Sequence, residues 1–582
     1  MLEYRERSSL LMASDLEIAH AASLAPIEEV AWELAIGVEE LIPMGKDMAK
    51  ISWPALKSRF DLPRGSLVLV TSVNPTPFGE GKTVTTIGLT QALNRIGQQA
   101  TCTIREPSMG PVFGIKGGAA GGGHSQVLPM EAVNLHFTGD MHAVTAAHNL
   151  CSALLDNHIH FGNACDIDTN RVLWPRVIDM NDRTLRNVTI GLGGPKNGVA
   201  REERFDITAA SEVMAILALA SDYADLRHRL GEIVIAESRS GFPVKADDIG
   251  AAGAMALLLR EAFLPNLVQT IEQNPAFIHA GPFANIAHGN SSIIADRLAL
   301  GLADYVVTEA GFGADMGAEK TMHIKAVASG IAPDCIILNV TVRSMKMHGG
   351  GFSTSGGQRP RPEEVAKENV DAVRAGATTN LARHVRNMCR FGVPVIASVN
   401  VFATDTQAEI DVLLDEARAA GAHDAVVCRV HADGGEGGTD LARSVVTACK
   451  SHIAAGRPFE PLFAPNAPLE EKILRIATNI YGAASIDFSP KALQELKMLQ
   501  NWGYGNLAVC MAKTQYSFSH EAKELGAPSG FTLPIRELRL NAGAGFIVAV
   551  CGTMMTMPGL PRIAAAENMD MDEDGNLLGM FS

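Results

Sequence analysis

Short apolar runs alternate along this chain with segments whose apolar residues recur at helical spacing. Continuous β-branched runs predict buried strands, and stripes with a period near 3.6 residues predict helices. The predicted strands span residues 67–73, 188–191, 232–236, 304–308, 335–342, 393–399, 425–430 and 507–510, and the predicted helices include 84–96, 209–220, 251–260, 363–374, 381–391, 407–420 and 439–452. This alternation is typical of α/β proteins, in which helices cover both faces of a parallel sheet and ligands bind at the carboxyl ends of its strands.

The strand predicted at 67–73 leads into a loop with the residue types of a nucleotide-phosphate cradle. It breaks at Asn74-Pro75, and the loop ends in Lys82-Thr83, where the helical pattern begins. Glycines let loop N–H groups approach phosphate oxygens, a lysine reaches the β- and γ-phosphates, and a threonine hydroxyl binds Mg²⁺. The candidate ATP-binding residues are Thr76, Pro77, Phe78, Gly79, Glu80, Gly81, Lys82 and Thr83, and Thr83 is also the candidate Mg²⁺ ligand.

The loop departs at its first position from the usual pattern G-x-x-x-x-G-K-[ST]. That pattern places glycine where this chain has Thr76, and Pro77 follows. An ordinary glycine turn between a strand and a helix is the alternative interpretation. The strand pattern before the loop and the helix pattern after it favour the phosphate cradle.

Composition narrows the class of protein. The 582 residues, 47% hydrophobic and 19% charged, indicate a folded chain of several domains. A formal net charge of −15 argues against nucleic-acid binding, which basic surfaces usually carry. Nine scattered cysteines without a C-x-x-C pair argue against a disulfide framework, a zinc site or an iron–sulfur cluster, and favour a reducing cytoplasm. The first residues lack the long apolar core of a signal peptide.

One segment has the length of a membrane-spanning helix and no charged residue, from 541 to 561. It is interrupted by several glycines, among them Gly543, Gly545 and Gly552, and by Pro558. A buried strand at 546–550 flanked by loops fits this pattern better, so we expect no membrane span.

The pattern divides the chain into regions. Residues 14–362 are predicted to form an N-terminal domain around a P-loop NTPase-like parallel sheet, and 363–455 a second, Rossmann-like α/β domain. Residues 456–582 are predicted to form a smaller C-terminal region. The glycine- and proline-rich stretch 349–362 is the candidate boundary or mobile loop.

A glycine-rich stretch follows the phosphate loop, from 103 to 123, with Arg105-Glu106 near its start. Glycine loses much backbone entropy on ordering, so such a run is justified where backbone closely approaches a ligand or another strand. A flexible surface loop is the alternative. The interleaved apolar residues Val112, Phe113 and Ile115 favour a packed loop.

Asp140, which follows Gly139, is a candidate base or ligand of a Mg²⁺-bound water; a helix cap is the alternative. His136, His142 and His148 recur every six residues. This spacing does not bring all three onto one helical face, so we predict no metal site from them.

Several strings resemble the formate–tetrahydrofolate ligase family (10-formyltetrahydrofolate synthetases) from Ser14 to Ser582. They are T-P-F-G-E-G-K-T at the phosphate loop, G-I-K-G-G-A-A-G-G-G, V-T-V-R-S-M-K-M-H-G-G (340–350), G-P-F-A-N-I-A-H-G-N-S-S (281–292), T-E-A-G-F-G-A-D-M-G-A-E-K (308–320), M-A-K-T-Q-Y-S (511–517) and M-T-M-P-G-L-P (555–561). Residues 1–13 precede the resemblance, and we expect a disordered leader or a start codon assigned too early.

The resemblance implies a ligase that joins formate to tetrahydrofolate at the expense of ATP. The expected products are 10-formyltetrahydrofolate, ADP and phosphate, with formyl phosphate as the intermediate held by the N-terminal domain. It also implies Mg²⁺ with the ATP, activation by a monovalent cation (ammonium or potassium), and a cytoplasmic homotetramer. By the same resemblance Lys82 neutralises the transferring phosphate, Arg105 holds formate and then formyl phosphate, Asp140 is an active-site aspartate, and Glu106 is linked to the monovalent cation.

For folate, the resemblance implies aromatic rings on both sides of the pterin. Phe402 matches one ring, and Asn400 precedes it at the end of a predicted strand. The other ring is usually tryptophan, and this chain has His431, which offers less stacking area, so we expect weaker folate binding. A solvated loop histidine is the alternative. His124 replaces a usual tyrosine and Asp433 a usual lysine.

Two other functions share the phosphate loop. A ligase of the dethiobiotin-synthetase type would act on another carboxylate, but it leaves the strings at 341–350 and 400–406 unexplained. A nucleotide-dependent switch of the partitioning-ATPase type uses a basic residue early in the loop, where this chain has Asn74 and Pro75. Dependence of ADP release on formate and on folate separates the three.

Overall fold

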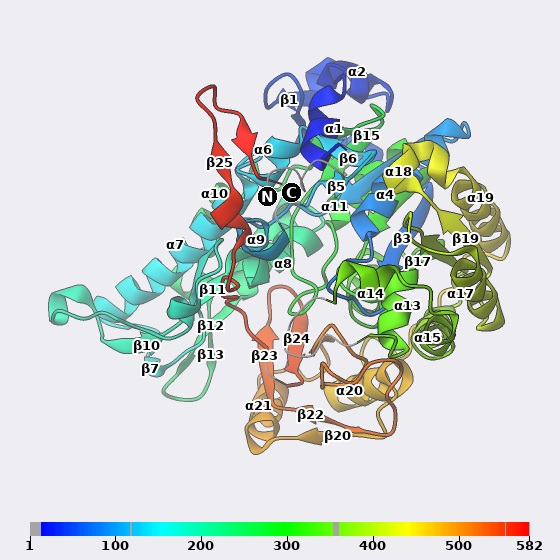
Figure 1. The fold of residues 1–582 in the computed structure, drawn as a ribbon. Helices are drawn as coiled ribbons and strands as arrows, with labels where there is room; N and C mark the ends of the chain where they lie inside the picture. Colours follow the sequence, from blue (N-terminus) through cyan, green and yellow to red (C-terminus); the bar gives the residue numbers. More distant parts are fainter. Residues whose placement is uncertain (1–12, 117–118, 353–359, 553, 581–582) are drawn as a thin grey trace, which may run out of the picture.

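A large mixed sheet forms the centre of the molecule (Figure 1). The computed structural model describes residues 13–116, 119–352, 360–552 and 554–580. The strand order is β1-β2-β14-β15-β4-β16-β3-β17-β18-β19, and β6 with β5 joins at β14. The strands are β1 (Leu41–Pro43), β2 (Ala49–Ile51), β3 (Ser66–Ser72), β4 (Ala100–Ile104), β5 (Gly121–Gly122), β6 (Ser125–Leu128), β14 (Asn266–Thr270), β15 (Pro275–Ile278), β16 (Tyr305–Glu309), β17 (Cys335–Thr341), β18 (Val395–Asn400) and β19 (Asp424–Cys428).

Neighbouring strands from β15 to β19 are all parallel. The strands β1, β2, β6 and β14 attach in antiparallel pairs on the other side. The predicted α/β class is therefore confirmed, with a mixed rather than a purely parallel sheet.

Successive residues of the parallel strands enter different cores, as the period of two in a strand requires. On β17, Ile336 and Leu338 pack with α16 (Ala382–Cys389) and α17 (Gln407–Ala419). Ile337 packs instead with α4 (Lys82–Arg95) and α19 (Thr439–Ala454). Because both faces are covered, these strands are continuously apolar in sequence, which is why the pattern predicted them.

The predicted elements at these strands and helices are present, and the differences have local causes. The helix expected at 363–374 is two helices, α14 (Pro362–Ala366) and α15 (Val370–Gly376), because Asn369 caps the second with its side chain. The strand expected at 188–191 is β9 (Val188–Ile190), which pairs with β10 (Arg201–Glu203) outside the main sheet. The sequence pattern missed β4 and the long helix α7 (Asp140–His160), whose apolar stripe is weak.

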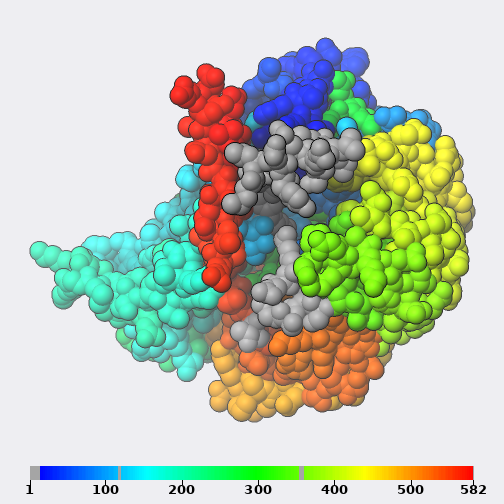
Figure 2. Space-filling view, in the orientation of Figure 1, coloured from blue at the N-terminus to red at the C-terminus, as the bar shows by residue number. Residues whose placement is uncertain are grey.

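Two smaller parts flank the central sheet. The strands β7 (Ile167–Val172), β12 (Val234–Ser238) and β13 (Pro243–Lys245), with β9 and β10, form an arm that projects from one side (Figures 1 and 2). The C-terminal region contains a sheet of β21 (Ala508–Ala512), β24 (Phe546–Val550) and β23 (Glu537–Asn541). β24 confirms the strand predicted at 546–550, and its residues are buried. Among the described helices, none combines the length and apolarity needed to cross a membrane.

The main sheet continues across the boundary expected near 362. β18 and β19, which we expected in a second α/β domain, pair in parallel with β17 and with each other. Part of the expected boundary stretch, 353–359, and the expected leader up to residue 12 lie outside the described residues. The division of the chain into domains stays a prediction.

Candidate active site

The phosphate loop connects β3 to α4 at the carboxyl end of the sheet. All residues of β3 are buried, and α4 begins at Lys82. Gly79 and Gly81 have φ angles of +75° and +69°, a left-handed conformation that favours glycine. A Cβ on Gly81 would also lie 3.0 Å from Nδ2 of Asn400. The loop therefore requires glycine at both positions, as its interpretation as a phosphate cradle predicts.

Glu80 holds the loop together from inside. Its Oε1 accepts hydrogen bonds from the backbone N–H and the hydroxyl of Thr76, at 2.7 and 2.9 Å. Its Oε2 accepts from the hydroxyl of Thr341 at 3.4 Å. Burial raises the pKa of Glu80, and these hydrogen bonds oppose the rise. The threonine that replaces the usual first glycine thus has a structural use, because its hydroxyl closes the loop on Glu80.

Charged and polar residues at the ends of three neighbouring strands meet beside this loop. Arg105 follows β4, Glu309 ends β16, and Thr83 is the second residue of α4, the helix after β3. Nη2 of Arg105 donates to Oε1 of Glu309 at 3.3 Å, and the Thr83 hydroxyl donates to Oε2 of Glu309 at 2.7 Å. Nζ of Lys82 donates to the Ser72 hydroxyl at 3.3 Å. Of the predicted residues, the structure brings Lys82, Thr83 and Arg105 into one site.

The sequence pattern did not identify Glu309, which links Arg105 to Thr83. A signal was present, because an acid directly follows the strand predicted at 304–308. Carboxyl ends of parallel strands are the expected place for ligand-binding residues. Gly311, two residues further, leaves room for the guanidinium, since a Cβ there would lie 3.0 Å from Nη1 of Arg105.

The oxygen atoms of Thr83 and Glu309 suit Mg²⁺. Mg²⁺ prefers oxygen ligands and usually takes only one or two from the protein when it binds with nucleotide phosphates. Within the described residues there is no group of three or more histidines, cysteines or acids placed to hold a metal by themselves. A hydroxyl with one carboxylate is therefore a donor set that fits a metal shared with ATP.

Glu106 and Asp140 lie in a second, more deeply buried charge cluster. Nζ of Lys50 contacts Oδ1 and Oδ2 of Asp140 at 2.9 and 2.8 Å, and Nδ2 of Asn266 donates to Oδ2 at 2.9 Å. Asp140 is the first residue of α7, and its carboxylate is thus ion-paired and hydrogen-bonded. Burial, together with the nearby Asp140 charge, raises the pKa of Glu106 well above its ordinary value.

One oxygen of Glu106 makes this cluster suitable for a cation. Oε2 of Glu106 is buried and has no hydrogen-bond partner among the described residues. A buried carboxylate oxygen without a donor is costly unless a positive charge is nearby. A monovalent cation would lower that cost, so the residues present fit the predicted cation site.

The predicted folate residues occupy two neighbouring strand ends. Asn400 ends β18, opposite Cys428 at the end of β19, and Phe402 and His431 follow these strands. Phe402 is 36% exposed, and the guanidinium carbon of Arg343 lies 3.7 Å from its ring centroid, so Arg343 covers one ring face while part of the side chain stays open to solvent. His431 is exposed within α18 (Val430–Asp433).

Asn400 contacts the phosphate loop directly. Its Nδ2 donates to the backbone carbonyl of Glu80 at 3.0 Å and to the Thr85 hydroxyl at 3.1 Å. Asn339 of β17 donates to the same hydroxyl at 2.8 Å. The residue predicted for folate binding therefore also supports the phosphate loop, and its contact with folate stays a prediction.

The glycine-rich stretch packs against the folate side. The backbone N–H of His124 donates to the carbonyl of His431 at 2.9 Å, and a Cβ on Gly123 would collide with that carbonyl. His124 and Asp433 also line one surface cavity of about 380 Å³, together with Arg95, Glu272 and Gly434. The end of the run is thus packed and Val112 is buried, as expected, whereas Ile115 is 69% exposed, against the expectation. The three departures from the family pattern are neighbours in space.

Comparison with known proteins points to one family. Residues 13–581 match the family described as formate–tetrahydrofolate ligase. The formate–tetrahydrofolate ligase of Paracoccus denitrificans is 55% identical over 570 residues, which cover 98% of this chain and all of that protein. Those of Dinoroseobacter shibae and a Roseiflexus species are each 53% identical, again over 98% of this chain and all of the relative.

Proposed function

The chain belongs to the formate–tetrahydrofolate ligase family, and from this premise we propose how its residues carry out the reaction. It catalyses the ATP-dependent joining of formate to tetrahydrofolate, which yields 10-formyltetrahydrofolate, ADP and phosphate. One observation carries the assignment of the site: Lys82, Thr83, Arg105 and Glu309 meet at the carboxyl ends of β3, β4 and β16.

Charge decides the order of the chemical steps. Formate is a poor electrophile because its carboxylate is already negative. A carboxylate oxygen first attacks the γ-phosphorus of ATP, so that ADP leaves and formyl phosphate forms. The N10 amine of tetrahydrofolate then attacks the formyl carbon, loses its proton, and displaces phosphate. Both steps require positioning and neutralisation of negative charge more than covalent help from the protein.

On the ATP side, Lys82 and the loop N–H groups neutralise the transferring phosphate. Thr83 and Glu309 supply oxygen ligands for Mg²⁺, which when bound offsets charge on the phosphate oxygens. Arg105 orients formate and then formyl phosphate, since its planar fork suits carboxylate and phosphate alike. Its hydrogen bond to Glu309 aims the guanidinium toward the phosphate loop.

The buried cluster of Glu106, Asp140 and Lys50 contributes charge next to Arg105. We assign the monovalent cation to Glu106, whose Oε2 lacks a donor among the described residues. The negative charge of Asp140 lies close to that cation, and Lys50, which is ion-paired with Asp140, balances the charge of Asp140. In this arrangement Asp140 acts by charge at the active site.

On the folate side, the pterin stacks on the free face of Phe402, whose other face carries Arg343. His431, from the neighbouring strand end, supplies the second ring. Because imidazole has a smaller area than indole, it contributes less to pterin binding. Asn400 stands between the two halves and places the folate amine near the phosphate loop.

The finer architecture and assembly belong to the same proposal. We assign the parallel part of the sheet to a P-loop NTPase-like unit, with β18 and β19 as its Rossmann-like extension. We also propose a cytoplasmic homotetramer. Large apolar side chains on and beside the projecting arm support a subunit contact, because Phe161 is 78%, Phe242 67% and Leu192 64% exposed.

The deciding experiment measures ADP formation with ATP and formate, with and without tetrahydrofolate. The folate product is read by its acid conversion to methenyl-folate absorbance. We expect turnover that needs both substrates, disappears in Lys82→Ala, and persists in Lys57→Ala, an exposed lysine of α3 (Trp53–Arg59). ATP turnover that ignores formate and folate would contradict the proposal and favour a nucleotide switch or a ligase of another acid.

A further inference from the structure

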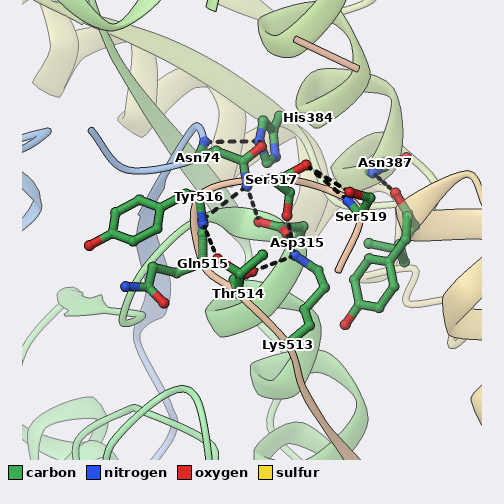
Figure 3. Close-up of polar contacts among 12 residues, drawn as sticks. Asn74, Asp315, His384, Asn387, Lys513, Thr514, Gln515, Tyr516, Ser517 and Ser519 are labelled. Atoms are coloured by element: carbon green, nitrogen blue, oxygen red, sulfur yellow. Dashed lines mark hydrogen bonds and ion pairs between the residues drawn. The ribbon is translucent and has the colours of Figure 1, made fainter. Parts of the chain in front are cut away.

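A second set of buried polar residues lies behind the phosphate loop and centres on Asn74 (Figure 3). Asn74 is two residues beyond the end of β3 and two residues before Thr76. Its side chain is completely buried. Burying polar atoms is unfavourable unless they are hydrogen-bonded, so each bond around this residue is informative.

Two buried histidines hold the backbone of Asn74. Its N–H donates to Nε2 of His384, on α16, at 3.0 Å. The second histidine, His348, ends α13 (Val342–His348). Its Nε2 donates to the carbonyl of Asn74 at 3.3 Å, and its Nδ1 accepts from the N–H of Gly526. Burial lowers the pKa of His384 to about 3 and of His348 to about 4. Both rings are therefore neutral near pH 7 and offer one donor and one acceptor each.

The side chain of Asn74 is bound as completely as its backbone. Its Nδ2 donates to Oδ1 of Asp315 at 3.1 Å and to the carbonyl of Gln515 at 3.3 Å. Its Oδ1 accepts from Nδ2 of Asn380 at 2.9 Å. The start of the phosphate loop is thus fixed by residues that lie 241 to 441 positions away in sequence, including the C-terminal segment around Gln515.

A buried ion pair anchors that C-terminal segment. Nζ of Lys513 lies 2.7 Å from Oδ2 of Asp315, and both side chains are completely buried. Lys513 also donates to the carbonyls of Thr514 and Ser517, so the turn after β21 wraps around the ammonium group. Asp315 therefore shares its two oxygens between Asn74 and Lys513.

Such a network is an expensive way to stabilise a fold. Replacing a buried ion pair by well-packed apolar residues is often neutral or stabilising, whereas a hydrogen-bonded polar network fixes one geometry. In this network Nδ1 of His384 and Oδ1 of Asn380 have no partner among the described residues, but the side-chain atoms of Asn74 and Asp315 are all bound. Here the geometry that it fixes is the exit of β3 into the loop that cradles phosphate. Loop N–H groups are useful for catalysis only when they are oriented before the charge develops.

We propose that Asn74, Asp315 and Lys513 are positioning residues for ATP, which act by holding the first residues of the phosphate loop against the segment 513–517. The proposal rests on the proposed role of that loop in binding ATP. None of the three residues needs to touch the nucleotide. Their loss displaces the loop N–H groups, and displacements of about 1 Å at a reacting group cost up to about 100-fold in rate.

The main test is Asn74→Ala, which removes the side-chain bonds without burying an unpaired charge. At a temperature well below the unfolding transition, we expect the KM for ATP to rise about tenfold and kcat to fall, because a lost buried hydrogen bond typically costs this much. The KM for formate should change less than twofold. The dissociation constant of a non-hydrolysable ATP analogue, measured by calorimetry, should rise in parallel with the KM for ATP.

Asn387→Ala is the matched control. Like Asn74, Asn387 is a buried asparagine, and it lies on α16. It donates to the carbonyl of Ile480 at 2.8 Å, away from the loop. We expect a loss of thermal stability similar to that of Asn74→Ala, with an unchanged KM for ATP. Equal kinetic effects of the two variants would overturn the proposal.

The double variant Asp315→Asn with Lys513→Met tests the ion pair itself, because it removes both charges together. We expect a rise of about fivefold in the KM for ATP and in the dissociation constant of the analogue. Folded variants whose ATP constants stay within twofold of the parent overturn the proposal. Failure of both variants to fold, while Asn387→Ala folds, also overturns it, because the network would then serve only the fold.

Failure of the proposed function gives a different result. The parent protein would then bind the ATP analogue but show no ADP formation that depends on formate and tetrahydrofolate. The dissociation constants of the variants would still decide whether Asn74, Asp315 and Lys513 position the loop.

Discussion

The ATP half and the folate half of the candidate site are held in opposite ways. Around the phosphate loop, Asn74, Thr76 and Glu80 are buried and hydrogen-bonded to partners from several strands and helices. On the folate side, Phe402 and His431 lie at the surface beyond the ends of β18 and β19. The same edge of the sheet thus carries a buried, hydrogen-bonded loop on the ATP side and solvent-exposed rings on the folate side.

The difference fits the two ligands that we propose for these halves. A phosphate group is small and highly charged, and its binding depends on donors that are oriented in advance. A pterin ring is large and flat, and stacking on an exposed ring gives area without a fixed network. Substitutions in the ATP half should therefore affect both catalysis and stability, whereas substitutions of Phe402 and His431 should affect folate binding alone.

The largest effect is expected at Arg105. Arg105→Lys keeps the charge but loses the planar fork that contacts Glu309, so we expect kcat/KM for formate to fall by about 100-fold or more, equivalent to about 3 kcal/mol. Steady-state kinetics with varied formate measure it. Arg171→Lys, at an arginine of the arm paired with Glu237, serves as control and should change nothing. If Arg105→Lys lowered kcat/KM less than Phe402→Leu does, the proposed difference between the ATP half and the folate half would be wrong.

Low pH should reduce the free energy of unfolding through His348 and His384, the two buried histidines beside the phosphate loop. In the unfolded chain His348 and His384 protonate near pH 6.5, whereas in the fold their pKa values are about 4 and about 3. Between these values the unfolded state binds more protons, so the free energy of unfolding falls as pH is lowered, by up to about 1.4 kcal/mol per pH unit for each histidine.

Thermal melts of the parent and of His384→Gln at pH 7, 6 and 5 isolate this effect from other titrating groups. We expect the melting temperature of the variant to decrease less over this interval than that of the parent. Parallel curves would show that His384 is not held in its neutral form.

A moderate effect is expected at Phe402. Phe402→Leu removes the stacking face and the partner of Arg343, so the KM for tetrahydrofolate should rise about three- to tenfold. The KM for ATP and the melting temperature should stay constant, because the ring is partly exposed. Trp32→Leu, at an exposed residue of α2 (Ile27–Trp32), is the control for loss of an exposed ring. A fall in stability with no change in the folate KM would contradict the stacking assignment.

The smallest effect is expected at His431. His431→Trp restores the larger ring of the family pattern and should lower the KM for tetrahydrofolate about two- to fivefold. His423→Trp, at an exposed residue just before β19, places the same ring at the opposite end of that strand and should have no effect. If both variants keep the parent KM for folate, His431 is a solvated loop residue, as the alternative interpretation holds.

The sequence by itself determined the elements whose information is local. The apolar run of β3, the glycine loop and Lys82-Thr83 are contiguous, and the left-handed φ angles of Gly79 and Gly81 agree with the residue types found there. The strings shared with the family determined the reaction and directed attention to Arg105, Phe402 and His431. Buried parallel strands were recognisable because both of their faces are apolar.

Only the tertiary structure decided the strand order and the partners that depend on it. Glu309 meets Arg105 and Thr83 because β16 lies between β4 and β3, and Asn400 supports the phosphate loop because β18 continues the same sheet. Thr76 could be explained only once Glu80 was seen to accept its hydroxyl. Local pattern carries no information on which distant segments become neighbours, since that depends on how buried faces and polar groups of the whole chain are satisfied together.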